Sequence, residues 1–204
     1  MDSSGSNQAP SLVERAKGII LSPKTEWVRI AGEDTTTKEV ATGYVIPLML
    51  IGPACGIIGS ILFGGAYAGI YAPSPVRAVV GAVVAFVLAL ISFYLLTILA
   101  HVLAPRFGAT EGESRSFKLV AYSLTPSLLI GLLTLWPALW PLQVLAFYGI
   151  YLIYLGATPM LGIPQDKAMP YTVVLVVCAF VLNIIVGALT AAHVLLVGAM
   201  GLMG

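Results

Sequence analysis

The chain has 204 residues, of which 59% are hydrophobic and 9% are charged, and its mean hydropathy is +0.98. Soluble domains carry about 25% charged residues, so a water-soluble fold of this length would expose too much apolar surface. The composition therefore favours an integral membrane protein, and the net charge of +1 gives no general attraction to nucleic acid.

The first 40 residues divide into a tail and an amphipathic segment. Residues 1–10 are polar and small, which predicts a disordered tail. Residues 11–40 begin with a capping-box spacing and a helix that ends just before Pro23. On this helix the predicted apolar face holds Leu12, Val13, Ala16, Ile19 and Ile20, with Glu14, Arg15 and Lys17 elsewhere.

The amphipathic segment has three alternative roles that the residues leave open. The helix is expected to take one of three positions: on the membrane surface, packed against the membrane spans, or as a binding element for a protein partner. Trp27 follows the helix and is expected to anchor near the lipid headgroups. Thr36 and Glu39 repeat the capping-box spacing immediately before the first predicted span.

Stretches without charged residues predict the membrane domain, residues 41–204. A crossing needs about 20 apolar residues, so the longest stretch, after Lys118, suits a helical hairpin. Its break falls at LWPALWP, residues 135–141, because proline interrupts helices and tryptophan prefers the membrane boundary. GGAYAGIYAPSP, after the first span, suits an interfacial loop. The predicted spans are 42–63, 77–102, 118–134, 141–161 and 171–195.

Charge asymmetry predicts the orientation of these spans. With five crossings, every Lys and Arg except Arg77 falls on the side of the N-terminus. Positive charge marks the cytoplasmic side, so the N-terminus is predicted inside and the C-terminus outside. The polar residues Asp166 and Lys167 then mark a short cytoplasmic turn, in which Pro164 ends one helix and Pro170 begins the next.

Small residues and prolines dominate the span interiors. Glycine and alanine recur four residues apart in the first two spans, which predicts close helix packing or, alternatively, homodimerisation. Prolines within the spans predict kinks or the frame of a binding site. Asn183 is expected to form an interhelical hydrogen bond. The interiors hold no acidic or basic residue, which weakens a pump or ion-coupled carrier.

Neither a catalytic group nor a metal or cofactor site is predicted. His101 and His193 close spans at opposite membrane faces, so they cannot share a metal ion. Cys55 and Cys178 lie in apolar runs and are expected to behave as small hydrophobic residues. An intramembrane enzyme is therefore the weakest of the functional alternatives.

Four segments together carry a family resemblance: LVERAKGIILSPKTEW, TGYVIPLMLIGPACGIIGS, AYSLTPSLLIGLL and YLIYLGATPMLGIPQDKAMPYTVV. In this order they resemble the Yip family of Ypt/Rab-interacting membrane proteins, particularly its bacterial branch. The resemblance implies a five-helix membrane domain with a cytoplasmic N-terminal region, here in a bacterial inner membrane. It also implies action through partners rather than chemistry. Of the eukaryotic Asp-Leu-Tyr-Gly-Pro motif only Gly52-Pro53 remain, so GTPase binding is not carried over.

The matched segments also predict which residues form a shared functional surface or, structurally, fix kinks and the inner turn. These residues are Tyr44, Pro47, Gly52, Pro53, Tyr122, Pro126, Tyr154, Gly156, Pro159, Asp166, Lys167 and Tyr171. The main hypothesis is a non-enzymatic membrane protein that organises or binds membrane lipids, a protein partner of the 11–40 segment, or a second copy. The alternative is a passive transporter, channel or lipid-moving protein that uses the proline-kinked bundle.

Overall fold

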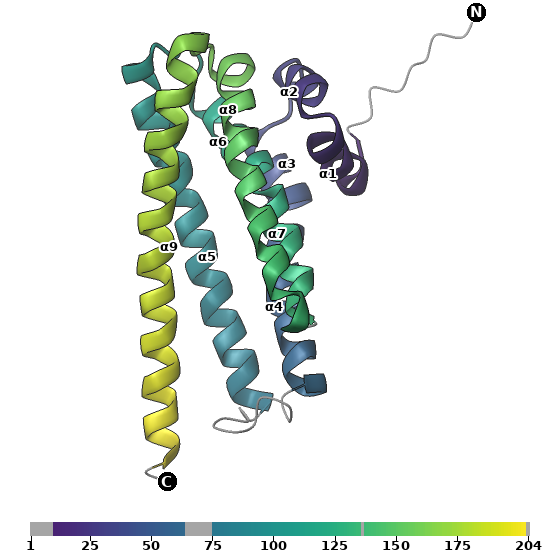
Figure 1. Cartoon of the computed structure of the whole chain (residues 1–204), viewed down its shortest axis with the longest axis vertical. Coiled ribbons are helices and arrows are strands. Elements are labelled where there is room, and N and C mark those ends of the chain that lie inside the picture. Colours follow the sequence, from purple (N-terminus) through teal and green to yellow (C-terminus); the bar gives the residue numbers. More distant parts are fainter. Residues whose placement is uncertain (1–9, 64–74, 136, 203–204) are drawn as a thin grey trace, which may run out of the picture.

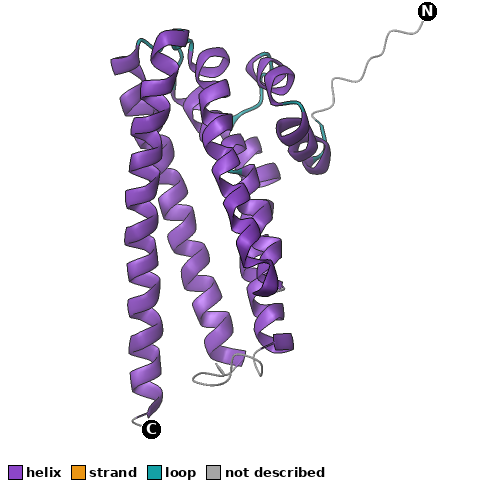
Figure 2. Cartoon of the chain, in the orientation of Figure 1, coloured by secondary structure: helices purple, strands orange, loops and turns teal. Residues whose placement is uncertain are grey.

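The computed structural model describes residues 10–63, 75–135 and 137–202, and every regular element within them is a helix (Figure 2). Five helical stretches in this part of the chain are long and apolar enough to cross a membrane. They are Thr37–Gly59, Val79–Phe107, Glu113–Leu133, Pro141–Leu161 and Gln165–His193. The predicted all-α fold with five membrane-spanning helices is therefore confirmed. Except for Pro10 and Pro75, the predicted tail at 1–10 and the predicted loop at 64–75 lie outside the described residues.

Two short helices precede the first span: α1, Leu12–Leu21, and α2, Pro23–Ala31. The predicted capping box is present, because the Ser11 hydroxyl accepts from the Glu14 amide and the Glu14 carboxylate accepts from the Ser11 amide. The prediction for Pro23 is incomplete, since this residue also begins a second helix. Proline suits the first helical position because the N–H group there has no helical partner to lose.

The first span is a continuous run of three helical elements. Thr36 caps it, and Glu39 completes the predicted second capping box. A π-helical turn ends two residues before Pro47, which is the second residue of the α-helix that continues from it, and Pro53 lies inside the same helix. The wider turn accommodates a residue that cannot donate to the preceding turn. The elements are α3, Thr37–Val40; η1, Ala41–Val45; and α4, Ile46–Phe63.

The remaining spans include several short 3-10 segments besides the long α-helices. The third span breaks between Ser123 and Thr125, and Pro126 lies in the first turn of the helix that follows, which confirms the predicted interruption there. The elements are α5, Pro75–Leu103; η2, Ala104–Phe107; α6, Glu113–Ser123; α7, Thr125–Ile130; η3, Gly131–Leu135; η4, Pro137–Phe147; α8, Tyr148–Leu161; and α9, Gln165–Leu202.

The turn between α8 and α9 differs from its prediction. Gly162 ends α8 with a φ of +68°, a left-handed conformation that favours glycine. Pro164 precedes α9, and its carbonyl accepts from the Lys167 amide in the first turn of the helix. Asp166 shares this turn, where its negative charge suits the helix dipole. Pro170 lies inside α9, so the prediction that it begins the helix is wrong.

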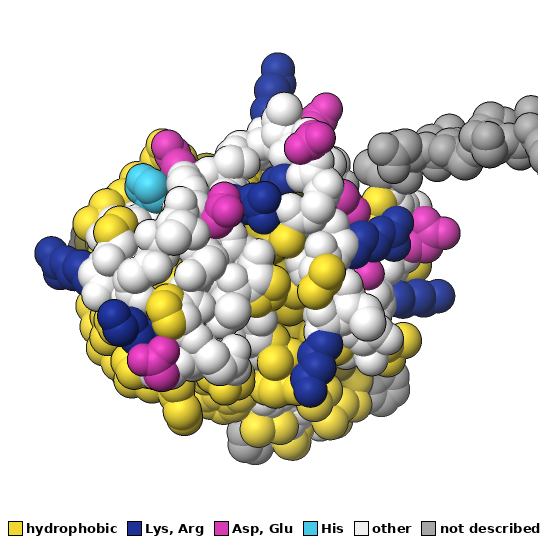
Figure 3. Space-filling model, turned by 90° about the horizontal axis from the view of Figure 1, so that it is seen from above, with side chains coloured by type: hydrophobic (Ala, Val, Ile, Leu, Met, Phe, Trp, Pro, Cys, Tyr) yellow, Lys and Arg dark blue, Asp and Glu magenta, His cyan; other side chains and the backbone are white. Residues whose placement is uncertain are grey.

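The helices form one bundle with most of its buried side chains toward one end. In Figure 1, α5 and α9 run side by side along one flank, and α1 and α2 lie beside the opposite flank. We call the end that carries α1, α2 and the α8–α9 turn the charged end; Figure 3 looks onto it, and lysine, arginine, aspartate and glutamate side chains gather there. Away from this end, most described side chains of α5 and α9 are partly or fully exposed.

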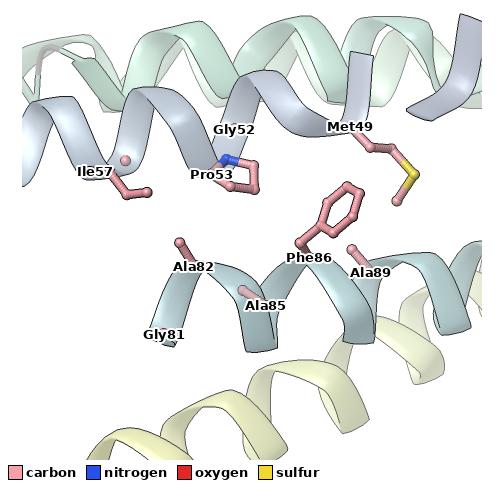
Figure 4. A pocket seen from close by; sticks show the side chains of 10 residues that line it. Met49, Gly52, Pro53, Ile57, Gly81, Ala82, Ala85, Phe86 and Ala89 are labelled. Atoms are coloured by element: carbon pink, nitrogen blue, oxygen red, sulfur yellow. The ribbon is translucent and has the colours of Figure 1, made fainter. Parts of the chain in front are cut away.

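The small residues of the first two spans serve two purposes. The backbone of Gly52 lies against that of Gly131. A Cβ atom on Gly131 would come within 2.8 Å of the Gly52 Cα, so the two helical segments pack closely at this point. Between α4 and α5, by contrast, the small residues line an open pocket of about 500 Å³ (Figure 4). Its lining is Met49, Gly52, Pro53, Gly56, Ile57, Gly81, Ala82, Ala85, Phe86 and Ala89.

Candidate functional site

The Arg15 side chain extends from α1 and is buried against α2 and α6, although the sequence places it off the apolar helix face. Only 3% of its surface is exposed. Its Nη1 donates to Oε1 of Glu26 at 2.6 Å, and its Nη2 donates to Oε1 of Glu33 at 2.6 Å. The guanidinium carbon also lies 5.4 Å from the ring centroid of Tyr122. We call these four residues the Arg15 network; they tie α1 and the end of α2 to α6.

The local sequence makes room for this network. Gly18 faces the Glu26 carboxyl group so closely that a Cβ atom would lie 2.7 Å from its Cδ. Glu26 lies on α2, and Glu33 follows two residues after the end of this helix, so the turn at Gly32 brings both carboxylates to Arg15. Val13, predicted to be on the apolar face, is instead 57% exposed, so the buried face of α1 is rotated toward Arg15.

Two further cations lie beside the Arg15 network and contact Glu33. The Lys118 ammonium is buried and donates to the Glu33 backbone carbonyl at 2.8 Å, and the exposed Arg29 lies 3.6 Å from the Glu33 carboxylate. Burial lowers the pKa of Arg15, but the hydrogen bond to Glu33 and nearby negative charge outweigh it and raise that pKa above its ordinary value. Arg15 therefore remains a cation in its buried position.

Two tyrosines predicted from different spans meet beside the Arg15 network. The Tyr44 hydroxyl lies 2.7 Å from Oγ1 of Thr125, which in turn donates to the Tyr122 carbonyl at 2.7 Å. The Tyr44 and Tyr122 rings contact each other edge to face, with centroids 4.9 Å apart. Pro126 follows Thr125 directly, so the break in the third span places a hydroxyl between the two tyrosines.

Trp27 also joins this cluster, and its prediction as a headgroup anchor is wrong. Its side chain is fully buried, with its ring edge to face against Tyr122. The ring fits into a notch at Gly156 of α8, where a Cβ atom would lie 2.8 Å from Cε2 of Trp27 and 2.5 Å from Cδ1 of Leu119. Gly156 thus allows α2 to dock against α8 through a large aromatic side chain.

Substitution of Gly156 by alanine is expected to destabilise the fold by about 1–3 kcal/mol, because Trp27 and Leu119 must move aside. Gly56→Ala is the matched control: its Cβ atom would meet no side chain within 4 Å. Since alanine favours a helix more than glycine by about 1 kcal/mol, the control is expected to be neutral or stabilising. SDS titration of both variants in mixed micelles measures the difference; equal stabilities would contradict the close packing of Trp27.

The other predicted surface residues lie away from the Arg15 network. Tyr171 is buried and donates its hydroxyl to the Ala100 carbonyl at 3.1 Å. The Tyr154 hydroxyl accepts a long hydrogen bond from Gln165 at the α8–α9 turn. Asp166 and Lys167 are exposed in the first turn of α9. Pro159 lies inside α8, and Pro47, Gly52 and Pro53 lie in α4.

The predicted residues therefore do not form one continuous site. The structure brings Tyr44, Tyr122, Pro126 and Gly156 together around the N-terminal helices. The sequence analysis missed Arg15, Glu26, Glu33 and Lys118, because the contacts among them join separate elements and leave no local pattern. A small pocket of about 130 Å³ opens beside this cluster and is lined by Pro10, Leu12, Arg15, Thr35, Glu39, Val40, Gly43, Tyr44 and Tyr122.

The chemistry of this site is that of a docking contact. Buried ion pairs and aromatic contacts hold α1 and α2 in one position, while the reactive groups are occupied by one another. Within the described ranges, no three His, Cys, Asp or Glu residues gather as metal ligands. The geometry thus fixes the outer surface of two helices that lie outside the membrane-spanning stretches.

Comparison with known families gives one match that covers most of the chain. The family model described as Yip1 domain matches residues 17–202. No curated protein and no solved structure matches the chain significantly. The match begins two residues after Arg15 and includes α2, Tyr122 and all five candidate spans.

Proposed function

We propose that this chain, which belongs to the Yip1 domain family, is a non-enzymatic integral membrane protein that binds membrane partners, protein or lipid. It does so through the outer surface of α1 and α2. The charge asymmetry around the spans supports an orientation with this surface in the cytoplasm and the C-terminus outside. A bacterial inner membrane is the proposed location.

The observation that carries this proposal is an exposed apolar surface on two helices that are held in place. Val13, Leu21 and Val28 are 57%, 76% and 66% exposed, although they lie outside the candidate spans. On the opposite side of the same helices, Arg15 and Trp27 are buried against the bundle. Large apolar side chains that are exposed on a fixed surface support a site of protein or membrane contact there.

Basic residues accompany this apolar surface. Lys17 lies between Val13 and Leu21 at four-residue spacings on α1, and Lys24 precedes Val28 by four residues on α2. Residues four apart share a helix face, so lysine and apolar side chains alternate along the exposed side. Such a face suits a partner that offers an apolar contact next to negative charge, as anionic lipid headgroups and acidic protein segments do.

Photo-crosslinking in cells tests the proposal. A photoreactive residue at Lys17 or Lys24 is expected to capture a defined neighbour, whereas the same residue at Glu113, also exposed at the charged end, is not. Val13→Ser, Leu21→Ser and Val28→Ser in one chain should reduce that capture about tenfold or more, because together they remove most of the apolar contact. Equal capture at all three sites, or capture unchanged by the triple substitution, would contradict the proposed surface.

Lipid movement is a second candidate that a specific observation favours. Besides the pocket between α4 and α5, a pocket of about 460 Å³ is lined by Ile20, Pro126, Leu129, Ile130, Leu133, Leu145 and Tyr148. Both linings are almost entirely apolar, which suits an acyl chain better than an ion or polar solute. Transfer of fluorescent phospholipid between leaflets of proteoliposomes tests this candidate, with Pro126→Ala as the comparison. Leaflet transfer no faster than in protein-free vesicles would remove it.

A further inference from the structure

Asn183 presents a polar side chain on an exposed face of α9. Its Nδ2 donates to the Ala179 carbonyl one turn earlier at 3.2 Å, and its Oδ1 has no hydrogen-bond partner in the described part of the chain. The prediction of an interhelical hydrogen bond is therefore wrong within one chain. Phe180, three residues earlier and therefore its neighbour on the helix surface, is apolar and exposed.

The position of Asn183 along α9 places its amide deep in the hydrocarbon. At 1.5 Å per residue, it lies about 27 Å from Gln165 and about 15 Å from His193, the two ends of the candidate span. The span is about 42 Å long and the hydrocarbon layer about 30 Å thick, so a centred span extends about 6 Å beyond the layer at each end. Asn183 then lies about 9 Å inside the nearer boundary, out of reach of lipid headgroups and water for its short side chain. An amide without its full set of partners is costly in lipid, and it favours association with another polar group at the same depth.

We propose that a second copy of the chain covers this face, with the two Asn183 amides paired across a twofold axis along the membrane normal. All copies insert in the same orientation, so each Asn183 meets its counterpart at the same depth. One carboxamide donates from Nδ2 to Oδ1 of the other, which satisfies the atom left without a partner in one chain.

The surroundings of Asn183 permit the close approach that this pairing needs. Ala179, Gly187 and Ala191 are spaced four residues apart from it on the same side of α9. A Cβ atom on Gly187 would meet nothing within 4 Å, so the helix surface is open at this point. Small residues let the backbones of two helices approach closely in a membrane.

A second copy fits this face better than an unrelated helix. A different partner would need a polar group of its own at the same depth, whereas symmetry guarantees one in a copy of this chain. This inference does not depend on the function proposed for α1 and α2, and the two surfaces lie on different elements. A variant that loses association at Asn183 is therefore expected to keep photo-crosslinking at Lys17.

Cysteine crosslinking in membranes tests the dimer. In a full-length background with Cys55→Ser and Cys178→Ala, Ala191→Cys is expected to give a disulfide-linked dimer under mild oxidation. Ile185→Cys, also exposed but on another side of α9, is the matched control and is expected to give little. Addition of Asn183→Leu should weaken association about three- to thirtyfold, the range for interhelical hydrogen bonds, and Asn183→Gln should keep most of it.

Three results would overturn the proposal. They are equal crosslinking at residues 185 and 191, crosslinking unchanged by Asn183→Leu, and two wild-type copies that share one nanodisc without associating. Misfolding is a separate cause of lost crosslinking, and SDS titration distinguishes it. Asn183 is exposed and its hydrogen bond stays within α9, so Asn183→Leu is expected to unfold at the wild-type SDS fraction. Lost crosslinking with unchanged stability supports the dimer, and lost crosslinking with reduced stability counts against the role given to Asn183.

Discussion

Arg15→Ala is expected to lower the free energy of unfolding by about 3–5 kcal/mol, the range for removing one partner of a buried ion pair. The substitution leaves the buried Glu26 and the partly buried Glu33 without the cation to which both carboxylates are bonded. It also removes the guanidinium from the Tyr122 ring. Steric trapping or SDS titration in micelles measures the loss, and faster hydrogen exchange in α1 and α2 should accompany it.

Arg29→Ala provides the matched control for that measurement. Arg29 contacts the same two glutamates at 4.0 and 3.6 Å, but its side chain is 55% exposed. Solvent screens exposed ion pairs, so the expected loss is below about 1 kcal/mol. Equal losses for the two arginines would mean that burial does not set the strength of the Arg15 network, and the role assigned to it would be wrong.

Trp27→Ala is expected to cost about 3–5 kcal/mol, because it empties the notch at Gly156. The indole is fully buried between α2 and α8 and contacts Tyr122, so its loss leaves a cavity where the N-terminal helices dock. Hydrogen exchange is expected to rise throughout α2, and the melting temperature in detergent should fall.

Trp27→Phe separates packing from hydrogen bonding in the same notch. Among the described residues, the buried Trp27 Nε1 has no hydrogen-bond partner, so phenylalanine loses no bond and removes an unpaired donor. A loss of about 1–2 kcal/mol, smaller than for alanine, is expected from the smaller ring. If Trp27→Ala were as stable as the wild type, the indole would lie at the membrane boundary, as the sequence alone suggests.

The five spans were predictable because apolar length and the absence of charge are local properties of the sequence. The predicted fourth span, 141–161, has the same bounds as a candidate span of the structure. Both capping boxes form because Ser11 and Thr36 bond to residues only three positions away. The break at Pro126 follows equally directly from a missing backbone donor.

The site depended on contacts that no local pattern records. Trp27 follows an interfacial rule in sequence, but the notch at Gly156 in a distant helix decides its position. Arg15 reads as a solvent-facing residue until two carboxylates and the Tyr122 ring are brought beside it. The sequence around Pro170 is compatible with two positions, at the start of a helix or inside its first turns. In the structure α9 already begins at Gln165, which places Pro170 inside the helix.

Hydrogen exchange of residues 12–31 in the wild-type chain, reconstituted in nanodiscs, tests the central claim most directly. That claim is that Arg15 and Trp27 fix α1 and α2 to the membrane domain, so their outer surface has one position. The amides of Ile19 and Ile30, whose side chains are fully buried, are expected to exchange as slowly as those of α6 and to quicken together in Arg15→Ala. Exchange of α1 and α2 at the rate of an unstructured peptide in the wild type would contradict it.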